Sequence, residues 1–226
     1  MNMYKPNNLD YNTYLKVISD DVYWTVCNYN LFMMCETPNQ NAFRDLPDRY
    51  SFRLCGRDEL EIWNHIAVEE PNVNYVSEYY KKIYAKHEDE FFRRCTFVCN
   101  SDDKPIATCF LWRSYGEINT IGWFRTLPEY EGKGIGRALL SKILKEATFP
   151  VYLHTQPTSA RAIKLYSDFG FKLITDQMIG YRKNNLTESL PFLQMVLPEP
   201  DYLALQTIKA TPALIEAALS IATGEF

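Results

Sequence analysis

The sequence lacks the features that would point to a membrane protein or to a nucleic-acid-binding protein. No run approaches the ~18 consecutive apolar residues that a membrane-spanning helix needs, and residues 1–8 contain no apolar signal core. The net charge is −4, whereas a main partner such as nucleic acid or an anionic membrane favours a basic surface. We therefore expect a cytoplasmic protein with neither partner.

The sequence also lacks the cysteine spacing of a metal site. Its six cysteines form no CxxC pair and have no histidine at zinc-finger spacing. Cys95 and Cys99 share one face of a β-like stretch, where buried free thiols are the simplest interpretation and a reactive cysteine is the alternative. We expect no bound metal.

What is present is an ordinary globular composition that is rich in aromatic residues. Hydrophobic residues make up 46% and charged residues 23% of the 226 positions, and aromatic residues reach 15%. A chain of this length buries roughly 70% of its unfolded surface. A self-supporting core is expected.

Hydrophobic periodicity predicts a mixed α/β fold, with a central, partly antiparallel sheet flanked by helices. Alternating or short apolar runs predict strands, and apolar residues at helical spacing predict helices between them. The strands are expected at residues 50–55, 95–100, 105–112, 119–126, 151–155, 171–175 and 180–182, and the helices at residues 58–67, 76–90, 135–144 and 159–169.

The two ends of the chain extend this main domain. Dense aromatic residues predict strands at residues 22–28 and 30–35, and a helix is predicted at residues 213–222, with Thr211 as its cap and Pro212 in its first turn. We divide the chain into an N-terminal extension at residues 1–48, a main domain at 49–185 and a tail at 186–226. The terminal helix is expected to dock on the main domain or on a second copy, which leaves a homodimer open.

The glycine-rich turn at residues 131–137 predicts an anion site, because it joins a strand to a helix. Glycines let successive backbone N–H groups turn toward one point, and the helix N-terminus adds partial positive charge. Lys133 and Arg137 are nearby cations. A glycine turn without a ligand is the alternative. The turn matches neither the P-loop pattern nor the dinucleotide pattern GxGxxG.

Two motifs, in order and separated by a strand, resemble the GNAT family (Gcn5-related N-acetyltransferases). Residues 127–140, LPEYEGKGIGRALL, resemble the pyrophosphate loop of that family, and residues 162–171, AIKLYSDFGF, resemble its next motif. The resemblance covers about residues 50–183, so the main domain is expected to be a GNAT acetyltransferase domain.

The resemblance implies a site for acetyl-CoA as co-substrate. It implies that the loop holds the coenzyme A pyrophosphate, that the strand before the loop pairs with the pantetheine arm, and that Tyr166 lies near the sulfur. Trp123, beside the expected thioester, is a candidate for the acceptor pocket, with packing in the core as the alternative. The implied cofactor-binding residues are Phe124, Arg125, Thr126, Glu131, Gly132, Lys133, Gly134, Ile135, Gly136, Arg137, Ser159 and Tyr166.

The sequence departs from the family pattern at three positions. Glu131 stands where Arg or Gln is usual, Ser159 stands where Asn often contacts the pantetheine, and Thr120 stands near the position of a glutamate base. Glu117 and His154 are then the candidate proton acceptors, with Glu129 as a third. With Tyr166 as the proton donor, these complete the predicted catalytic set.

The predicted function is transfer of an acetyl group from acetyl-CoA to a primary amine, by direct attack in a ternary complex. The alternatives are an inactive coenzyme A-binding regulatory or structural module and a nucleotide-binding protein of another fold. The acceptor is a small-molecule or peptide amine that the sequence does not identify. One hypothesis is that a cationic amine is attracted by an acidic mouth, a cluster of carboxylates at the entrance of the site. Its residues would be Glu69, Glu70, Asp89 and Glu90.

Overall fold

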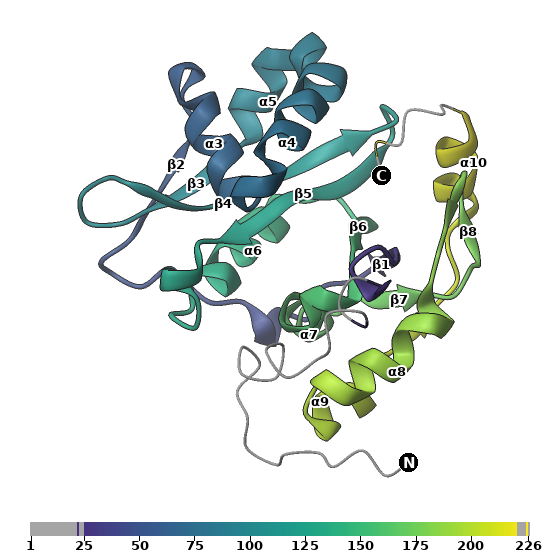
Figure 1. The fold of residues 1–226 in the computed structure, drawn as a ribbon. Coiled ribbons are helices and arrows are strands. Elements are labelled where there is room, and N and C mark those ends of the chain that lie inside the picture. Colours follow the sequence, from purple (N-terminus) through teal and green to yellow (C-terminus); the bar gives the residue numbers. More distant parts are fainter. Residues whose placement is uncertain (1–21, 23–24, 221–224, 226) are drawn as a thin grey trace. The chain divides into compact units, whose positions relative to one another are not determined.

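The computed structural model describes residues 22, 25–220 and 225, and they form two compact units. The central unit comprises residues 39–151 and 225. Of the described residues, the terminal unit comprises 22, 25–38 and 152–220. Figure 1 shows the elements of each unit.

The central unit contains an antiparallel sheet in the order β2-β3-β4-β5. The predicted hairpin and its neighbours are confirmed, with Asn100 at the turn between β3 and β4 accepting from the backbone N–H groups of Asp102 and Lys104. The strands are β2 (Ser51–Leu54), β3 (Thr96–Cys99), β4 (Pro105–Ser114) and β5 (Ile118–Thr126).

Helices cover both faces of this sheet (Figure 1). On one face, α3 (Leu60–Ala67), α4 (Val73–Tyr79) and α5 (Glu88–Arg94) enclose a core rich in aromatic side chains, centred on the fully buried Trp63. On the other face, α6 (Ile135–Lys145) buries Ile135, Leu139 and Ile143 against β3 and β4. The sheet is therefore the middle of three layers, as its alternating sequence requires.

The helical piece predicted at residues 76–90 is confirmed, but it is not one regular α-helix. The chain instead forms α4, a π-helical turn (Tyr80–Tyr84), a 3-10 turn (Ala85–His87) and then α5. His87, with φ −130° and ψ 39°, leaves the helical region and separates the pieces. The π turn keeps Tyr80, Ile83 and Tyr84 buried. A simple 3.6-residue pattern does not predict such a turn.

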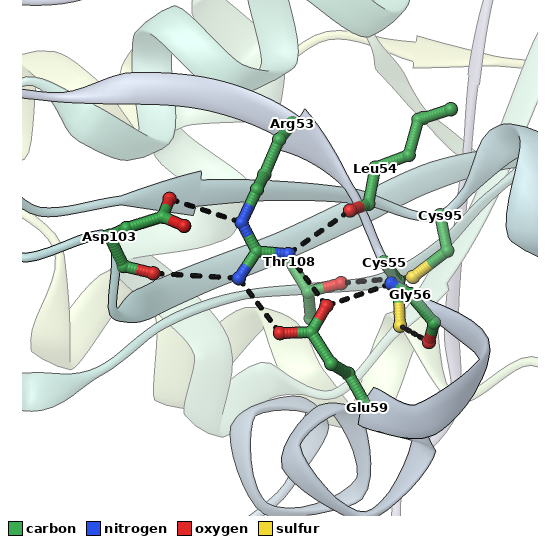
Figure 2. Close-up of polar contacts among 8 residues, drawn as sticks. All are labelled: Arg53, Leu54, Cys55, Gly56, Glu59, Cys95, Asp103 and Thr108. Atoms are coloured by element: carbon green, nitrogen blue, oxygen red, sulfur yellow. Dashed lines mark hydrogen bonds and ion pairs between the residues drawn. The ribbon is translucent and has the colours of Figure 1, made fainter.

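An ion-pair network fixes the connection from β2 to α3 (Figure 2). Arg53 donates from both terminal nitrogens to the Glu59 carboxylate, at 2.6 and 2.8 Å, and from Nε to Asp103 at 3.2 Å. The same carboxylate accepts the Gly56 N–H at 2.8 Å. Arg53 holds the pKa of Glu59 below its usual range. One carboxylate thus ties the strand to the start of the helix.

The terminal unit contains a mixed sheet in the order β10-β7-β1-β6. Strands β1 and β7 pair in antiparallel fashion, whereas β10 and β7 are parallel. The elements of this unit are β1 (Leu31–Cys35), β6 (Val151–Thr155), α7 (Ala160–Asp168), β7 (Lys172–Ile174), β8 (Met178–Ile179), β9 (Arg182–Lys183), α8 (Leu186–Val196), α9 (Glu199–Leu203), β10 (Thr207–Ile208) and α10 (Pro212–Ser220).

The predicted ends of the chain are partly confirmed. The strand at residues 30–35 is β1, but the strand at 22–28 is wrong, because residues 22, 25 and 26 are helical. Thr211 caps α10 by accepting the Leu214 N–H at 3.2 Å, as predicted, and α10 packs against β8. Residues 221 and 222 of that prediction lie outside the described residues. Of the strand predicted at residues 180–182, Gly180 (φ +57°) and Tyr181 form the turn between β8 and β9, and Arg182 begins β9.

These observations confirm the mixed α/β class with a partly antiparallel sheet flanked by helices. In the part of the chain that the structure describes, no helix is long and apolar enough to cross a membrane.

Candidate functional site

The candidate anion site is the turn that joins β5 to α6. The chain leaves β5 at Thr126, makes a 3-10 turn (Pro128–Tyr130) and enters α6 at Ile135. Gly132 and Gly134 have φ values of +74° and +82°, a conformation that residues with a Cβ adopt only at a cost. The two glycines therefore reverse the chain without strain.

The N-terminus of α6 faces solvent across this turn. Gly134 is the N-cap, and among the described residues no side chain caps the helix. Residues 131–134 are exposed. Because first-turn N–H groups have no acceptor within their own helix, those of residues 135–137 are suited to an anion, and the helix dipole favours negative charge there. The predicted phosphate guest fits this geometry.

The side chains of the loop are engaged with the protein itself. Lys133 donates to the Glu129 carbonyl at 2.7 Å, and its Nζ lies 4.9 Å from the Tyr130 ring centroid. Arg137 donates to the Ala42 carbonyl at 3.4 Å. The exposed Glu131 places a carboxylate at the loop. Backbone groups are thus the main attraction that the loop offers to an anion.

Strand β5 has a bulge just before the loop. The pairing with β4 runs Thr108 with Arg125 but Phe110 with Gly122, so two residues, Trp123 and Phe124, oppose one residue of β4. Trp123 has φ +48°, a left-handed conformation that is costly for an aromatic residue. A bulge of this kind redirects side chains and is common next to active sites.

The side chains of the predicted pantetheine strand have local structural roles. Phe124 packs on the α6 side of the sheet. The Arg125 guanidinium donates to the carbonyls of Ile66 at 3.0 Å and Val68 at 2.7 Å, which ties the end of α3 to β5. Thr126 pairs with Ala107 of β4. No local pattern in the sequence indicated the Arg125 contact, because its partners are 57 and 59 residues away.

His154 lies on β6 in the terminal unit and is poorly suited to act as a base. Its Nε2 is 2.9 Å from Asn30 Oδ1 and 3.0 Å from an Arg182 nitrogen. Burial, with the nearby Arg182 charge, lowers the pKa of His154 to about 3. The ring is neutral at physiological pH but binds a proton too weakly to deprotonate an ammonium ion.

Tyr166 and Ser159 also belong to the terminal unit. Ser159 is the N-cap of α7, but its side chain makes no capping bond. Tyr166 is buried in α7, with its ring 5.8 Å from that of Phe171.

Glu117, Thr120 and Glu129 lie in the central unit. Glu117 is exposed in the turn. Thr120 is buried and its hydroxyl is 2.8 Å from Ser114 Oγ. Glu129 lies in the 3-10 turn before the loop. Loop, β5, Glu117 and Glu129 therefore share the central unit, whereas the remaining candidates belong to the terminal unit.

Each of the four carboxylates of the predicted acidic mouth has a cationic or imidazole partner, which offsets part of the charge that would attract an amine. Glu69 lies 3.7 Å from Arg125, and Glu90 lies 2.8 Å from Arg94. The other two pairs are Asp89 with Arg57 and Glu70 with His65.

The described cysteines are not joined in disulfide bonds, and most of them are buried. Burial raises the pKa of Cys35 and of Cys99 to about 11, so both thiols are protonated at neutral pH. Within the described residues, no group of three or more histidine, cysteine, aspartate or glutamate side chains is arranged to hold a metal ion.

The fold is mixed α/β, and the glycine turn at the β5–α6 junction is its candidate anion site. Residues 60–171 match the model of the acetyltransferase (GNAT) family. The resemblance found in the two motifs is thereby confirmed, and this segment is a GNAT acetyltransferase domain.

Solved structures of low sequence identity also match. A GCN5-related N-acetyltransferase from Sphaerobacter thermophilus is 19% identical over 56% of this chain and 42% of that one, with a TM-score of 0.42. A GCN5-related N-acetyltransferase-like protein from Streptococcus suis is 14% identical over 68% and 63%, with a TM-score of 0.40. The chain thus spans less than two thirds of either structure. The comparison with curated proteins gives no match.

Proposed function

We propose that this chain is an N-acetyltransferase that transfers the acetyl group of acetyl-CoA to a primary amine, with its catalytic domain at residues 49–185. The observation that carries the proposal is the uncapped N-terminus of α6 behind two left-handed glycines, inside the segment that matches the family. This arrangement fits a pyrophosphate that is bound mainly by backbone N–H groups.

In this proposal the cofactor supplies an activated thioester, and the chain supplies position and protons. The N–H groups of residues 132–137 hold the pyrophosphate, with Ser159 as a further contact. The backbone of residues 124–126 orients the pantetheine arm. The bulge at Trp123 and Phe124 interrupts the pairing of β5 with β4 at the start of this segment. The reaction is direct attack by the amine in a ternary complex.

Two of the three predicted catalytic residues are retained. Tyr166 Oη is assigned as the donor of a proton to the departing sulfur. The exposed Glu117 is assigned as the acceptor that passes the amine proton to water. His154 is not assigned a role as base, because its lowered pKa makes it a weak proton acceptor.

The second candidate function is an inactive coenzyme A-binding module. The Glu131 carboxylate at the loop and the absence of a carboxylate at Thr120 favour it. Release of free coenzyme A in the presence of a panel of amines separates the two functions, because only the enzyme turns over.

Thermal unfolding with acetyl-CoA, coenzyme A, NAD and ATP in turn tests the cofactor assignment. A ligand at 100 times its Kd stabilises by about 2.7 kcal/mol, and each kcal/mol raises Tm by roughly 2–4 °C in a chain of this size. A rise with both coenzyme A forms, but not with NAD or ATP, is expected. No rise at millimolar concentration would refute the assignment.

A further inference from the structure

Three aromatic rings gather at the bulge of β5, on the face of the sheet that α3 and α4 cover. Tyr79 lies 5.3 Å from Trp123, and Tyr75 lies 6.2 Å from Tyr79 and 6.4 Å from Trp123, measured between ring centroids. We call these three residues the aromatic trio. Tyr75 is 63% exposed, and the other two are partly exposed. The trio is therefore open to solvent although it adjoins the core.

The Trp123 ring is held in one orientation. Its Nε1 donates to the Tyr84 hydroxyl at 2.9 Å, and Tyr84 is buried between Phe91, Phe110 and Trp112. The left-handed backbone at Trp123 is maintained against its conformational cost. A ring that is fixed before a ligand binds loses little entropy on binding.

Glu225 contacts the trio through its backbone, and its carboxylate is held at the neighbouring Tyr115. The Glu225 backbone carbonyl accepts from the Tyr79 hydroxyl at 3.1 Å and from Ser114 Oγ at 3.3 Å. Its side-chain Oε2 accepts from the Tyr115 N–H at 2.8 Å. Three donors from α4, β4 and the following turn thus hold one glutamate in the central unit. The carboxylate also contributes, after burial and other groups, to the raised pKa of Tyr84.

We propose that the aromatic trio and the Glu225 carboxylate form the acceptor subsite, and that it takes an aliphatic ammonium group. Ring faces attract cations through their quadrupole, Trp most strongly, and the carboxylate adds an opposite charge that a neutral ligand does not use. The cation–ring contacts recorded among the described residues involve other rings than those of Tyr75 and Trp123. The acceptor would then bind as a cation at the trio.

This inference rests on the proposed function, but binding tests it without catalysis. The probes are choline, whose quaternary nitrogen accepts no acetyl group, and 3,3-dimethylbutan-1-ol, its uncharged isostere. Saturation-transfer NMR titrations measure both. We expect choline to bind at least fivefold more tightly than the isostere. Equal affinities, or no binding of choline, would overturn the proposal.

Variants test where choline binds. Tyr75→Leu is expected to weaken choline binding at least fivefold, whereas Tyr75→Phe, which keeps the ring, retains it. Tyr181→Leu removes another exposed tyrosine, which is 67% exposed beside β8 in the terminal unit, and should leave binding unchanged. Equal losses in Tyr75→Leu and Tyr181→Leu would contradict the assignment.

Glu225→Gln tests whether the carboxylate attracts the cation or instead obstructs the trio. The amide keeps the acceptor oxygen for Tyr115 but removes the charge, so choline binding should fall while binding of the isostere does not. Tighter choline binding in this variant would mean that Glu225 obstructs the trio, and it would overturn the proposal. Coenzyme A thermal shifts on the same variants report the proposed function separately, because none of these residues belongs to the loop.

Discussion

Replacing Gly134 by alanine tests the loop most directly. A Cβ at Gly134 would lie 4.0 Å from Pro47 Cγ, its nearest neighbour, so the substitution causes no clash. Its cost is the backbone conformation, φ +82°, which disfavours a residue with a Cβ by about 1–2 kcal/mol. Tm should therefore fall by about 2–8 °C in a chain of this size.

The same substitution should weaken coenzyme A binding. Relief of the strain moves the first turn of α6, and with it the N–H groups that the pyrophosphate needs. The loss of one hydrogen bond to a charged group, about 1.5–3 kcal/mol, corresponds to an affinity loss of about 10- to 100-fold. Isothermal titration calorimetry with coenzyme A measures this loss.

Gly116→Ala is the matched control. Gly116 has φ +76°, a Cβ there meets no atom within 4 Å, and the residue lies in the β4–β5 turn. The control should lose similar stability and keep its coenzyme A affinity. If Gly134→Ala binds coenzyme A within twofold of Gly116→Ala, the loop is not the phosphate site.

Three further predictions concern stability and catalysis. Arg53 lowers the pKa of Glu59 in the folded state. The stabilisation from this ion pair is therefore complete above the unfolded pKa of about 4.3 and is lost as pH falls through the lower folded pKa. Glu59→Gln should lower the free energy of unfolding by roughly 1–3 kcal/mol at pH 7, and urea titrations should show a smaller loss of stability at acid pH in this variant. Gly122→Ala places a Cβ 2.8 Å from Phe110 Cε2 and should lower the free energy of unfolding by about 1–3 kcal/mol. Equal denaturant midpoints for wild type and variant would mean that Phe110 moves freely to make room. Tyr166→Phe should reduce kcat about 100-fold with coenzyme A affinity unchanged, and an unaltered kcat would remove Tyr166 from the mechanism.

Most of the central unit could be predicted from local patterns. Strand β5 and the glycine turn could be predicted because an apolar strand pattern ends at a glycine-rich segment. Helix α6 follows with apolar residues at helical spacing. Gly134 takes the left-handed conformation that only glycine adopts at little cost. These features depend on residues close in sequence.

The missed features depend on contacts between distant residues. Arg125 binds carbonyls at the end of α3, and Glu225 joins Tyr115 across 110 residues, which no periodicity encodes. The π turn at Tyr80–Tyr84 places Tyr80, Ile83 and Tyr84 in a core that residues from distant segments complete. Two carboxylates of the predicted acidic mouth also have distant partners, Asp89 with Arg57 and Glu69 with Arg125, whereas Glu90 and Arg94 form an i,i+4 pair within α5.

The departure at Glu131 is compatible with the proposed cofactor because of how the loop attracts an anion. Loop cations are already engaged, Lys133 with Tyr130 and Glu129 and Arg137 with Ala42, so binding depends on backbone N–H groups and the helix dipole. Glu131 is exposed, and exposed charges are screened over about 8 Å at physiological salt. Its repulsion of a phosphate should therefore weaken as salt rises. An affinity for coenzyme A that increases from low to physiological salt in wild type, but not in Glu131→Gln, would identify this carboxylate as the opposing charge; parallel salt dependences would show that it has no such effect.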